Sequence, residues 1–127
     1  NNQPVWADNF INRISNSKMG LNLSQGKAVK YYSSDRFAQL IGNGLLVLVD
    51  EKTKFKDFLN KNEIITYKNI NDLARKIIRF NKNDQLRKKI ARKGRKKYHK
   101  FFNSKKIAEY IINKTFDFKT KKYFWEK

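Results

Sequence analysis

The segment from Lys18 to Asp50 most constrains how this chain folds. It predicts a first strand over 18–24, a polar loop, an amphipathic helix over 34–43 and a second strand over 45–50. The second strand is apolar almost throughout, which is typical of a parallel strand covered on both faces. Two short strands joined through a helix predict a parallel βαβ unit. Since ligands of open α/β sheets bind beyond the carboxyl ends of the strands, function is expected in the loop after the first strand.

The rest of the chain continues this alternation and predicts one domain over residues 1–127. We expect a helix over 7–17, a short helix over 53–60, a third strand over 63–67, and helices from Asn69 or Asn71 to 80, over 84–102 and from Asn103 or Ser104 to 116. These elements predict the α/β class, with at least three parallel strands and helices on both faces. Residues 117–127 form an aromatic and basic tail without a clear period.

Apolar spacing also predicts which side chains are buried. Phe37, Leu40 and Ile41 share one face of the helix over 34–43, and Gly44 favours the end of that helix. The other inward residues are expected to be Phe55, Phe58, Leu59, Leu73, Ile77 and Phe80, followed by Leu86, Ile90, Gly94, Tyr98 or Lys97, and Phe101. The Lys and Arg residues of 82–100 should then occupy the solvent face of their helix.

Composition narrows the classes of site that the chain can carry. It contains no cysteine, which excludes a disulfide framework and a thiolate metal site. The single histidine, His99, has no acidic neighbour in the basic helix, which favours a surface position over a catalytic base. The 11 carboxylates are scattered, so no metal site is expected. No apolar run reaches membrane-spanning length, and we expect a cytoplasmic protein.

The formal net charge of +19 suggests nucleic-acid binding. The excess is nearly all lysine, 23 Lys against 7 Arg, alongside 15 Asn and 12 Ile. These residue types have A/T-rich codons, so we infer that genome composition raised the charge. A surface selected to bind phosphate is expected to use more arginine, whose planar fork pairs with phosphate bidentately. Nucleic acid is therefore the less favoured partner, and an anionic membrane surface is a further alternative.

Three local patterns follow one another over residues 18–116. They are the strand end Asn22-Leu23-Ser24, the helix end Gly42-Asn43-Gly44 before a buried strand, and the segment 84–95 followed by Tyr98, Phe101 and the helix over 107–112. In this order the chain resembles the carboxyl-terminal part of group 1 glycosyltransferases of the GT-B type. The resemblance implies a partial Rossmann-like sheet, half of a GT-B carboxyl-terminal domain.

The resemblance also implies a function. Such enzymes transfer a sugar from a nucleotide-sugar donor, here a UDP- or GDP-sugar, to an acceptor hydroxyl in glycan or envelope polysaccharide synthesis, commonly without a metal or another cofactor. This domain would hold the donor, and a missing amino-terminal domain would hold the acceptor. We therefore expect the fragment to be inactive alone. The sequence identifies no catalytic residue.

Two positions depart from the family pattern. Relatives often carry two glutamates spaced E-x7-E, and the matching residues here are Tyr31 and Gln39. Gln39 still offers hydrogen bonds to a ribose hydroxyl, although an uncharged amide forms weaker ones. Arg36 matches an arginine that some relatives carry three residues before the second glutamate.

The candidate donor-binding residues lie in the loop and at the start of the helix after it. They are Ser24, Gly26, Tyr31, Ser33, Ser34, Asp35, Arg36 and Gln39. A helix amino end carries free N–H groups and a partial positive charge, which suit a diphosphate. The alternative is that Ser34 or Asp35 is an ordinary helix cap, Arg36 a surface residue and the loop a plain connection.

The aromatic tail has two candidate roles. Together with Phe116 just before it, the tail holds five aromatic residues, a large apolar surface to leave in water without a partner. We expect it to pack on the absent domain in the intact protein. In the fragment it should be mobile, folded back on its own domain or paired with a neighbouring molecule. The alternative is contact with a membrane surface, which would place the protein at the inner membrane face.

Overall fold

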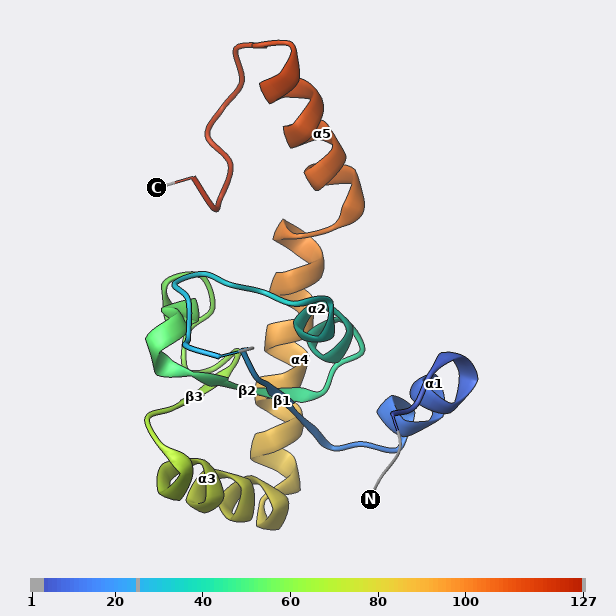
Figure 1. The fold of residues 1–127 in the computed structure, drawn as a ribbon, viewed down its shortest axis with the longest axis vertical. Helices are drawn as coiled ribbons and strands as arrows, with labels where there is room; N and C mark the ends of the chain where they lie inside the picture. Colours follow the sequence, from blue (N-terminus) through green and yellow to red (C-terminus); the bar gives the residue numbers. More distant parts are fainter. Residues whose placement is uncertain (1–3, 25, 127) are drawn as a thin grey trace.

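The computed structural model describes residues 4–24 and 26–126, which form a three-layered α/β body with a helical extension (Figure 1). The elements are α1 (Ala7–Ser15), β1 (Met19–Asn22), α2 (Asp35–Gly42), β2 (Leu46–Asp50), the 3₁₀ turns η1 (Glu51–Thr53) and η2 (Phe55–Asp57), β3 (Ile65–Tyr67), α3 (Ile70–Lys82), α4 (Asp84–Phe101) and α5 (Ser104–Thr115). The predicted α/β class is confirmed. Most predicted boundaries differ by one or two residues, which is usual where element ends fray.

All three strands are parallel, in the order β1-β2-β3. Leu48 of the central strand pairs with Leu21 on one side and with Ile65 on the other. The carboxyl ends of the strands therefore meet at one edge of the sheet. The predicted parallel βαβ unit is confirmed.

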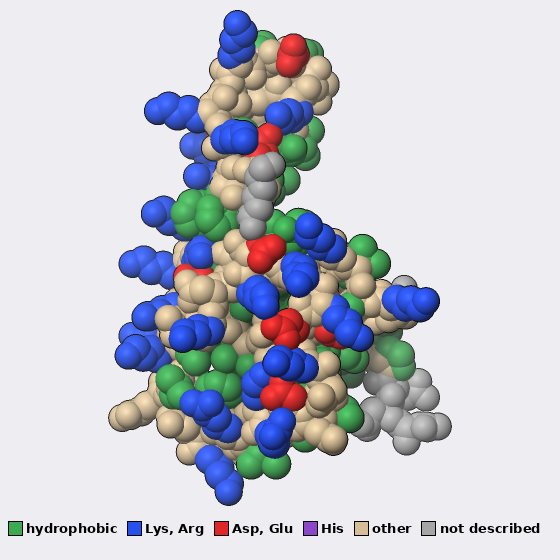
Figure 2. Space-filling view, turned by 90° about the vertical axis from the view of Figure 1, so that its left-hand side faces the viewer, with side chains coloured by type: hydrophobic (Ala, Val, Ile, Leu, Met, Phe, Trp, Pro, Cys, Tyr) green, Lys and Arg blue, Asp and Glu red, His purple; other side chains and the backbone are tan. Residues whose placement is uncertain are grey.

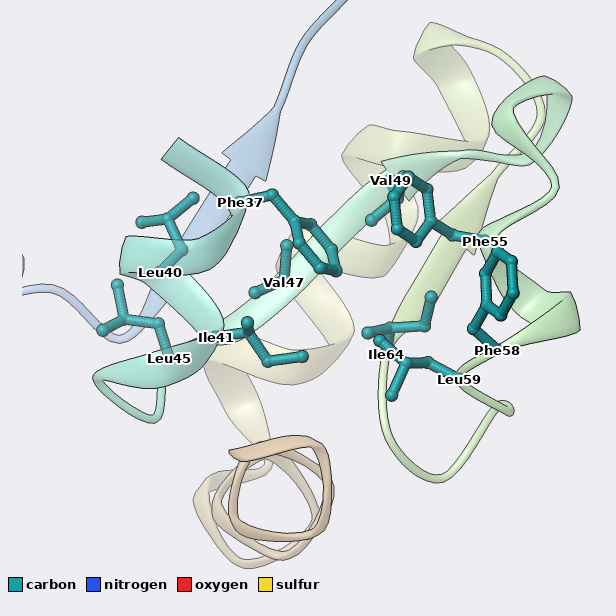
Figure 3. Close-up of a cluster of buried hydrophobic side chains, with 10 residues drawn as sticks. All are labelled: Phe37, Leu40, Ile41, Leu45, Val47, Val49, Phe55, Phe58, Leu59 and Ile64. Atoms are coloured by element: carbon teal, nitrogen blue, oxygen red, sulfur yellow. The ribbon is translucent and has the colours of Figure 1, made fainter. Parts of the chain in front are cut away.

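Alternating residues of β2 divide the core between the two faces of the sheet. Val47 and Val49 face α2 and the η turns, where they join a cluster with Phe37 and Ile41 (Figure 3). Leu46 and Leu48 face the other side, where α3 and the first half of α4 cover them. Every residue of this strand before Asp50 is buried, as the apolar run predicts.

The turn after α2 needs a glycine. Gly44 has φ +83°, a left-handed conformation that strains other residues. Its N–H donates to the carbonyl of Ile41, and the N–H of Leu45 donates to the carbonyl of Leu40. This pair of bonds is the Schellman arrangement that ends helices. It turns the chain directly into β2.

The predicted short helix over 53–60 is wrong in its form. The structure has two 3₁₀ turns, divided by Lys54 with φ +59°. That left-handed residue breaks the α-helical hydrogen-bond pattern. Phe55, Phe58 and Leu59 are nevertheless buried, as their spacing predicts.

The predicted inner stripe of α4 is partly right. Ile90 and Gly94 are buried, but so is Arg87, which the charge pattern placed on the solvent face. Its Nη1 donates to the carbonyl of Phe80 at 3.3 Å and pairs with the Asp84 carboxylate. These partners, one in the last turn of α3 and one at the first residue of α4, make burial of the guanidinium tolerable. Ile77, predicted to be buried, is 39% exposed.

The aromatic tail folds back on its own domain, one of the three arrangements expected for the fragment. α5 and the tail extend beyond the α/β body (Figure 1). Trp125 stacks on Phe102 with the ring centroids 5.5 Å apart. The tail is also tied to α5, because Asn113 Nδ2 donates to the Tyr123 hydroxyl at 2.7 Å. Packing on an absent domain stays a prediction, as does the assignment of residues 1–127 to one donor-binding domain.

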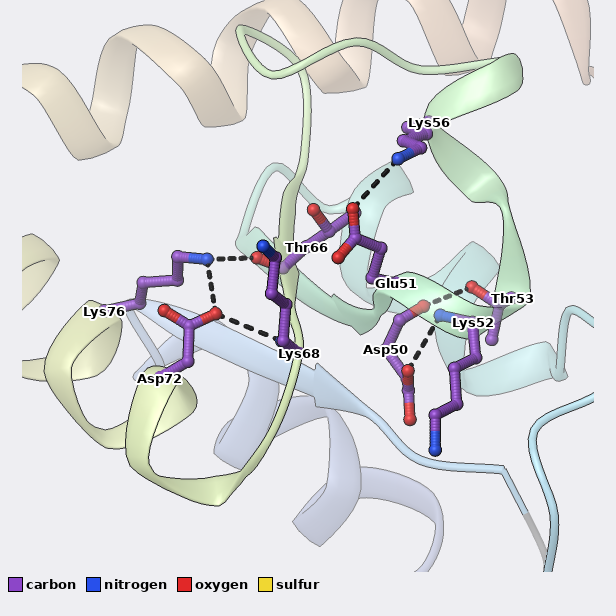
Figure 4. A network of polar contacts seen from close by, with 9 residues as sticks. All are labelled: Asp50, Glu51, Lys52, Thr53, Lys56, Thr66, Lys68, Asp72 and Lys76. Atoms are coloured by element: carbon purple, nitrogen blue, oxygen red, sulfur yellow. Dashed lines mark hydrogen bonds and ion pairs between the residues drawn. The ribbon is translucent and has the colours of Figure 1, made fainter.

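A polar network joins β3 to the start of α3 (Figure 4). One carboxylate oxygen of Asp72 accepts from the backbone N–H of Lys68 at 3.0 Å and from Lys76 Nζ at 2.7 Å. The same ammonium group donates to the carbonyl of Thr66 at 2.7 Å. The hydrogen bond from Lys76, and then that from the Lys68 backbone, lowers the pKa of Asp72 below its ordinary value.

We predict that Gly94→Ala destabilises the fold. A Cβ at this position would lie 2.2 Å from the carbonyl oxygen of Glu63, so α4 would have to move away from the segment before β3. Overpacking of this kind costs about 1–3 kcal/mol in the free energy of unfolding. Denaturant unfolding measures it. The exposed neighbour Lys93 gives the control, because Lys93→Ala should change stability by no more than about 0.5 kcal/mol. Equal stability of the two variants would contradict the close approach.

We predict that stability falls in acid. The pKa of Asp72 is lowered, and the hydrogen bond from Arg87 likewise lowers the pKa of Asp84. A carboxyl with a lowered folded-state pKa stabilises the fold above its unfolded pKa, and the contribution is lost as pH falls through the lowered value. The free energy of unfolding should therefore be level at neutral pH and fall below about pH 4. Asp72→Asn should flatten that fall in denaturant titrations at several pH values, and an unchanged slope would contradict it.

Candidate functional site

The carboxyl end of β1 and the amino end of α2 meet through a hydrogen bond between two side chains. Asn22 is the last residue of β1 and is only 1% exposed. Ser34 is the N-cap residue of α2, and its hydroxyl donates to Asn22 Oδ1 at 3.0 Å. Ser34 therefore links the helix to the sheet, and its side chain does not cap the helix. Ser34 holds the N-cap position, as the alternative expects, but it lacks the side-chain hydrogen bond of an ordinary cap.

Two buried polar atoms at this edge have no hydrogen-bond partner. Among the residues that the structure describes, they are Asn22 Nδ2 and Ser24 Oγ. A buried polar atom without a partner costs about 1–3 kcal/mol, and native proteins hold few of them. Both atoms can donate a hydrogen bond. Together with the N–H groups at the start of α2, they place several unused hydrogen-bond donors at this edge of the sheet.

The loop before α2 is held against the η turns by Tyr31. Its backbone N–H donates to the carbonyl of Thr53 at 2.8 Å, and its hydroxyl donates to an Asp57 carboxylate oxygen at 2.9 Å. Its ring meets that of Phe58 edge to face, with the centroids 4.8 Å apart. The φ of +62° at Tyr31 is a strained conformation that these contacts maintain. Tyr31 therefore fixes the loop, and its side chain is engaged at η2.

The face of α2 that carries Arg36, Gln39 and Asn43 lies along α1. Arg36 and Gln39 line a hollow with Trp6 and Phe10, and Gln39 and Asn43 line the next one. All three polar residues are exposed. The structure thus brings Arg36 and Gln39 together between α1 and α2, one helical turn apart.

The other predicted site residues are at the surface. Ser33 and Asp35 are exposed beside the N-cap of α2. Gly26 is exposed and has φ +73°, the freedom expected of a glycine in this loop. Gln25 lies outside the described residues.

The donor-binding residues predicted from the sequence do not include Asn22, although the strand end Asn22-Leu23-Ser24 belongs to the pattern shared with the family. The signal was a polar residue on the buried face of an otherwise apolar strand. Asp50 ends β2 in the same way, one residue beyond the partner of Asn22 in the register. Its carboxylate accepts from the backbone N–H of Lys52 at 2.8 Å (Figure 4). Burial, and then the charge of Asp50, raises the pKa of the neighbouring Tyr67.

The structure also bears on metal binding, on the single histidine and on membrane insertion. In the described part of the chain, no group of three or more His, Asp or Glu is placed to hold a metal ion. His99 is exposed, and its Nε2 lies 3.0 Å from the carbonyl oxygen of Gly42 at the end of α2. None of the described helices has the length and apolar character needed to cross a membrane.

Comparison with known proteins gives a family match. The model of a family described as glycosyl transferase-like matches residues 1–113, a range that includes the sheet and every candidate site residue. No curated protein and no solved structure matches the chain. Since the match covers nearly all of the 127 residues, this chain belongs to the glycosyl transferase-like family.

Proposed function

We propose that this domain holds the nucleotide-sugar donor of a GT-B glycosyltransferase, which transfers the sugar from UDP or GDP to an acceptor hydroxyl. The observation that supports this most is the buried Asn22 amide, whose unpartnered Nδ2 lies at the amino end of α2. Glycan or envelope polysaccharide synthesis is the proposed setting.

The donor's diphosphate fits the chemistry of this edge. Its oxygens accept hydrogen bonds, and Asn22 Nδ2 and Ser24 Oγ are free to donate them. The backbone N–H groups in the first turn of α2 add further donors and a partial positive charge, which suits an anion. Arg36 stands in the same turn and offers a forked cation.

The other predicted residues take supporting roles in this proposal. Gly26 lets the backbone turn beneath the donor, and Tyr31 fixes the loop. Ser33 and Asp35 flank the diphosphate at the helix end. Gln39 stands in place of a family glutamate and would hydrogen-bond the ribose. No residue is assigned to catalysis.

Transfer also needs an acceptor site. The resemblance to GT-B enzymes places that site on an amino-terminal domain, so we propose that the described domain alone binds the donor without transferring the sugar. We further propose a cytoplasmic location, with the basic surface attracted to the anionic inner face of the membrane. Lys and Arg side chains spread widely over the surface, and they are dense along the left edge of the view in Figure 2.

Asn22→Asp tests the proposed site. The change replaces the donor Nδ2 by a carboxylate oxygen of nearly the same shape and adds a negative charge where the diphosphate would lie. We expect the affinity for UDP and GDP to fall at least tenfold, equivalent to about 1.4 kcal/mol. Titration with each nucleotide, followed by backbone amide shifts, measures it, and the shifts should centre on residues 33–39.

Asn43→Asp is the matched control. It makes the same chemical change at the opposite end of α2, where Asn43 is exposed. Its affinity should stay close to that of the original chain. Amide shifts confined to the helix over 84–101 would instead indicate nonspecific anion binding and contradict the proposed site.

The alternative function is a basic nucleic-acid-binding module built on α4 and α5. The observation behind it is the exposed outer face of α4, which carries Lys88, Lys89, Arg92, Lys93 and Lys96. No aromatic ring is interleaved on that face to stack single-stranded bases.

We predict weak duplex DNA binding without sequence preference, with Kd about 10⁻⁴ to 10⁻⁶ M at physiological salt. A sequence-specific Kd near 10⁻⁸ M, measured by fluorescence anisotropy, would favour the alternative.

A further inference from the structure

We propose that the turn after α5 is a membrane-insertion element, in which Phe116 and Phe118 enter the interface of an anionic bilayer. We call these two residues the tip pair. The inference does not depend on the proposed donor site. It goes beyond a general attraction of the basic surface to the membrane, because it names the apolar side chains that enter the lipid.

The tip pair is set apart from the other aromatic side chains of this region. Phe116 is 66% exposed and Phe118 is 58% exposed, the highest values among the described aromatic residues from 104 onward. The two rings stack on each other with their centroids 5.8 Å apart. By contrast, Phe124 stacks on Phe101 of α4, with centroids 4.3 Å apart. The inner rings of the tail therefore pack on the domain, and the tip pair faces water.

The way in which α5 ends holds the pair in place. The N–H of Phe118 donates to the carbonyl of Asn113 at 2.9 Å, the long bond of a Schellman motif. Asp117, between the two phenylalanines, has φ +53°. Aspartate adopts this left-handed conformation more readily than most residues other than glycine. The turn therefore presents two stacked rings in a defined arrangement.

The tip pair lies at the far end of the molecule. α5 extends beyond the α/β body, and the turn that follows it is at the upper end of the view in Figure 1. The 12 residues of α5 span about 18 Å. Ile112 lies one helical turn before Phe116, and both Ile112 and its neighbour Ile111 are exposed. The apolar surface therefore continues from the tip along one side of α5.

The residues around the pair are mainly basic. Residues 104–126 contain six lysines and three carboxylates. The lysines nearest to the pair in sequence are all exposed, and they are Lys114, Lys119, Lys121 and Lys122. Lys114 pairs with Glu126 at 2.8 Å, and Asp117 adds a second negative charge at the turn. The excess of lysine still leaves a positive surface, which attracts anionic lipid headgroups.

A bilayer fits this combination better than a protein partner does. Exposed apolar side chains bordered by lysines are typical of segments that lie in the membrane interface. A bilayer can accept a convex apolar tip, whereas a stable protein complex buries roughly 800 Å² on each partner. A second copy of the chain is disfavoured, because each copy carries a formal net charge of +19.

Binding to lipid vesicles tests the tip pair. The chain should sediment with vesicles of phosphatidylglycerol and phosphatidylcholine, and less with vesicles of phosphatidylcholine alone. Combining Phe116→Ala with Phe118→Ala should lower the partition coefficient on the anionic vesicles about tenfold, because less apolar surface then leaves water. Circular dichroism shows whether each variant keeps its fold.

The matched control combines Ile70→Ala with Ile78→Ala. These two side chains are 72% and 57% exposed, close to the values of the tip pair. They belong to α3, which lies at the opposite end of the molecule (Figure 1). The partition coefficient of this variant should equal that of the original chain.

Tryptophan fluorescence tests insertion directly. The chain has two tryptophans, which Trp6→Phe and Trp125→Phe remove, and Phe118→Trp then adds one at the tip. Anionic vesicles should move the emission of this variant to shorter wavelength, because the indole leaves water for the bilayer interface. Its vesicle affinity should be kept, since tryptophan is favoured at that depth.

Three results would overturn the inference. Equal partitioning of the original chain and the double alanine variant at 116 and 118 would leave the pair for a protein partner, such as the missing amino-terminal domain. Unshifted emission of the vesicle-bound Phe118→Trp variant would place the rings outside the lipid. A dimer in solution that the double alanine variant abolishes would assign the pair to a second copy. Each result leaves the proposed donor site standing, because that site is tested separately by titration with UDP and GDP.

Discussion

Burial of β2 from both sides is the constraint on which this structure depends. Val47 and Val49 pack toward α2, and Leu46 and Leu48 pack toward α3 and α4. A strand buried in this way needs a neighbour on each edge and a helical layer on each face. The left-handed turn at Gly44 delivers the chain into β2 immediately after α2, which fixes the helix over the sheet. The edge where the strand ends meet is positioned by the same packing.

The geometry of the candidate site depends on the hydrogen bond that the Ser34 hydroxyl donates. A serine at the start of a helix ordinarily bonds to an N–H of its own first turn. Ser34 instead bonds to the Asn22 amide, so the sheet and the helix are joined and the helix end keeps its donors. α2 therefore lacks the stabilising side-chain cap of its first turn, and in exchange its start is fixed to the end of β1. Such an exchange is typical of binding sites, where geometry matters more than the stability of one helix.

Patterns within one element were readable from the sequence, and contacts between elements were not. The apolar run of β2, the inner face of α2 and the stop at Gly44 are local features, and the structure confirms them. Burial of Arg87 depends on the carbonyl of Phe80 in the last turn of α3, and the role of Tyr31 depends on Asp57, 26 residues away. The strand–loop–helix order predicts the region of the candidate site, but burial of the Asn22 amide beside Ser34 is a contact between two elements that the order does not predict.

The order of the strands has a consequence for how the domain behaves in solution. β1 and β3 lie at the edges of the sheet, and an edge strand offers unpaired backbone groups to any other strand. Here β1 has four residues and β3 only three. Edges this short offer few hydrogen bonds to an incoming chain, and short edge strands are one of the ways in which proteins resist aggregation. Two features therefore limit pairing of the sheets of different copies. The outer strands are short, and the lysines of the copies repel one another.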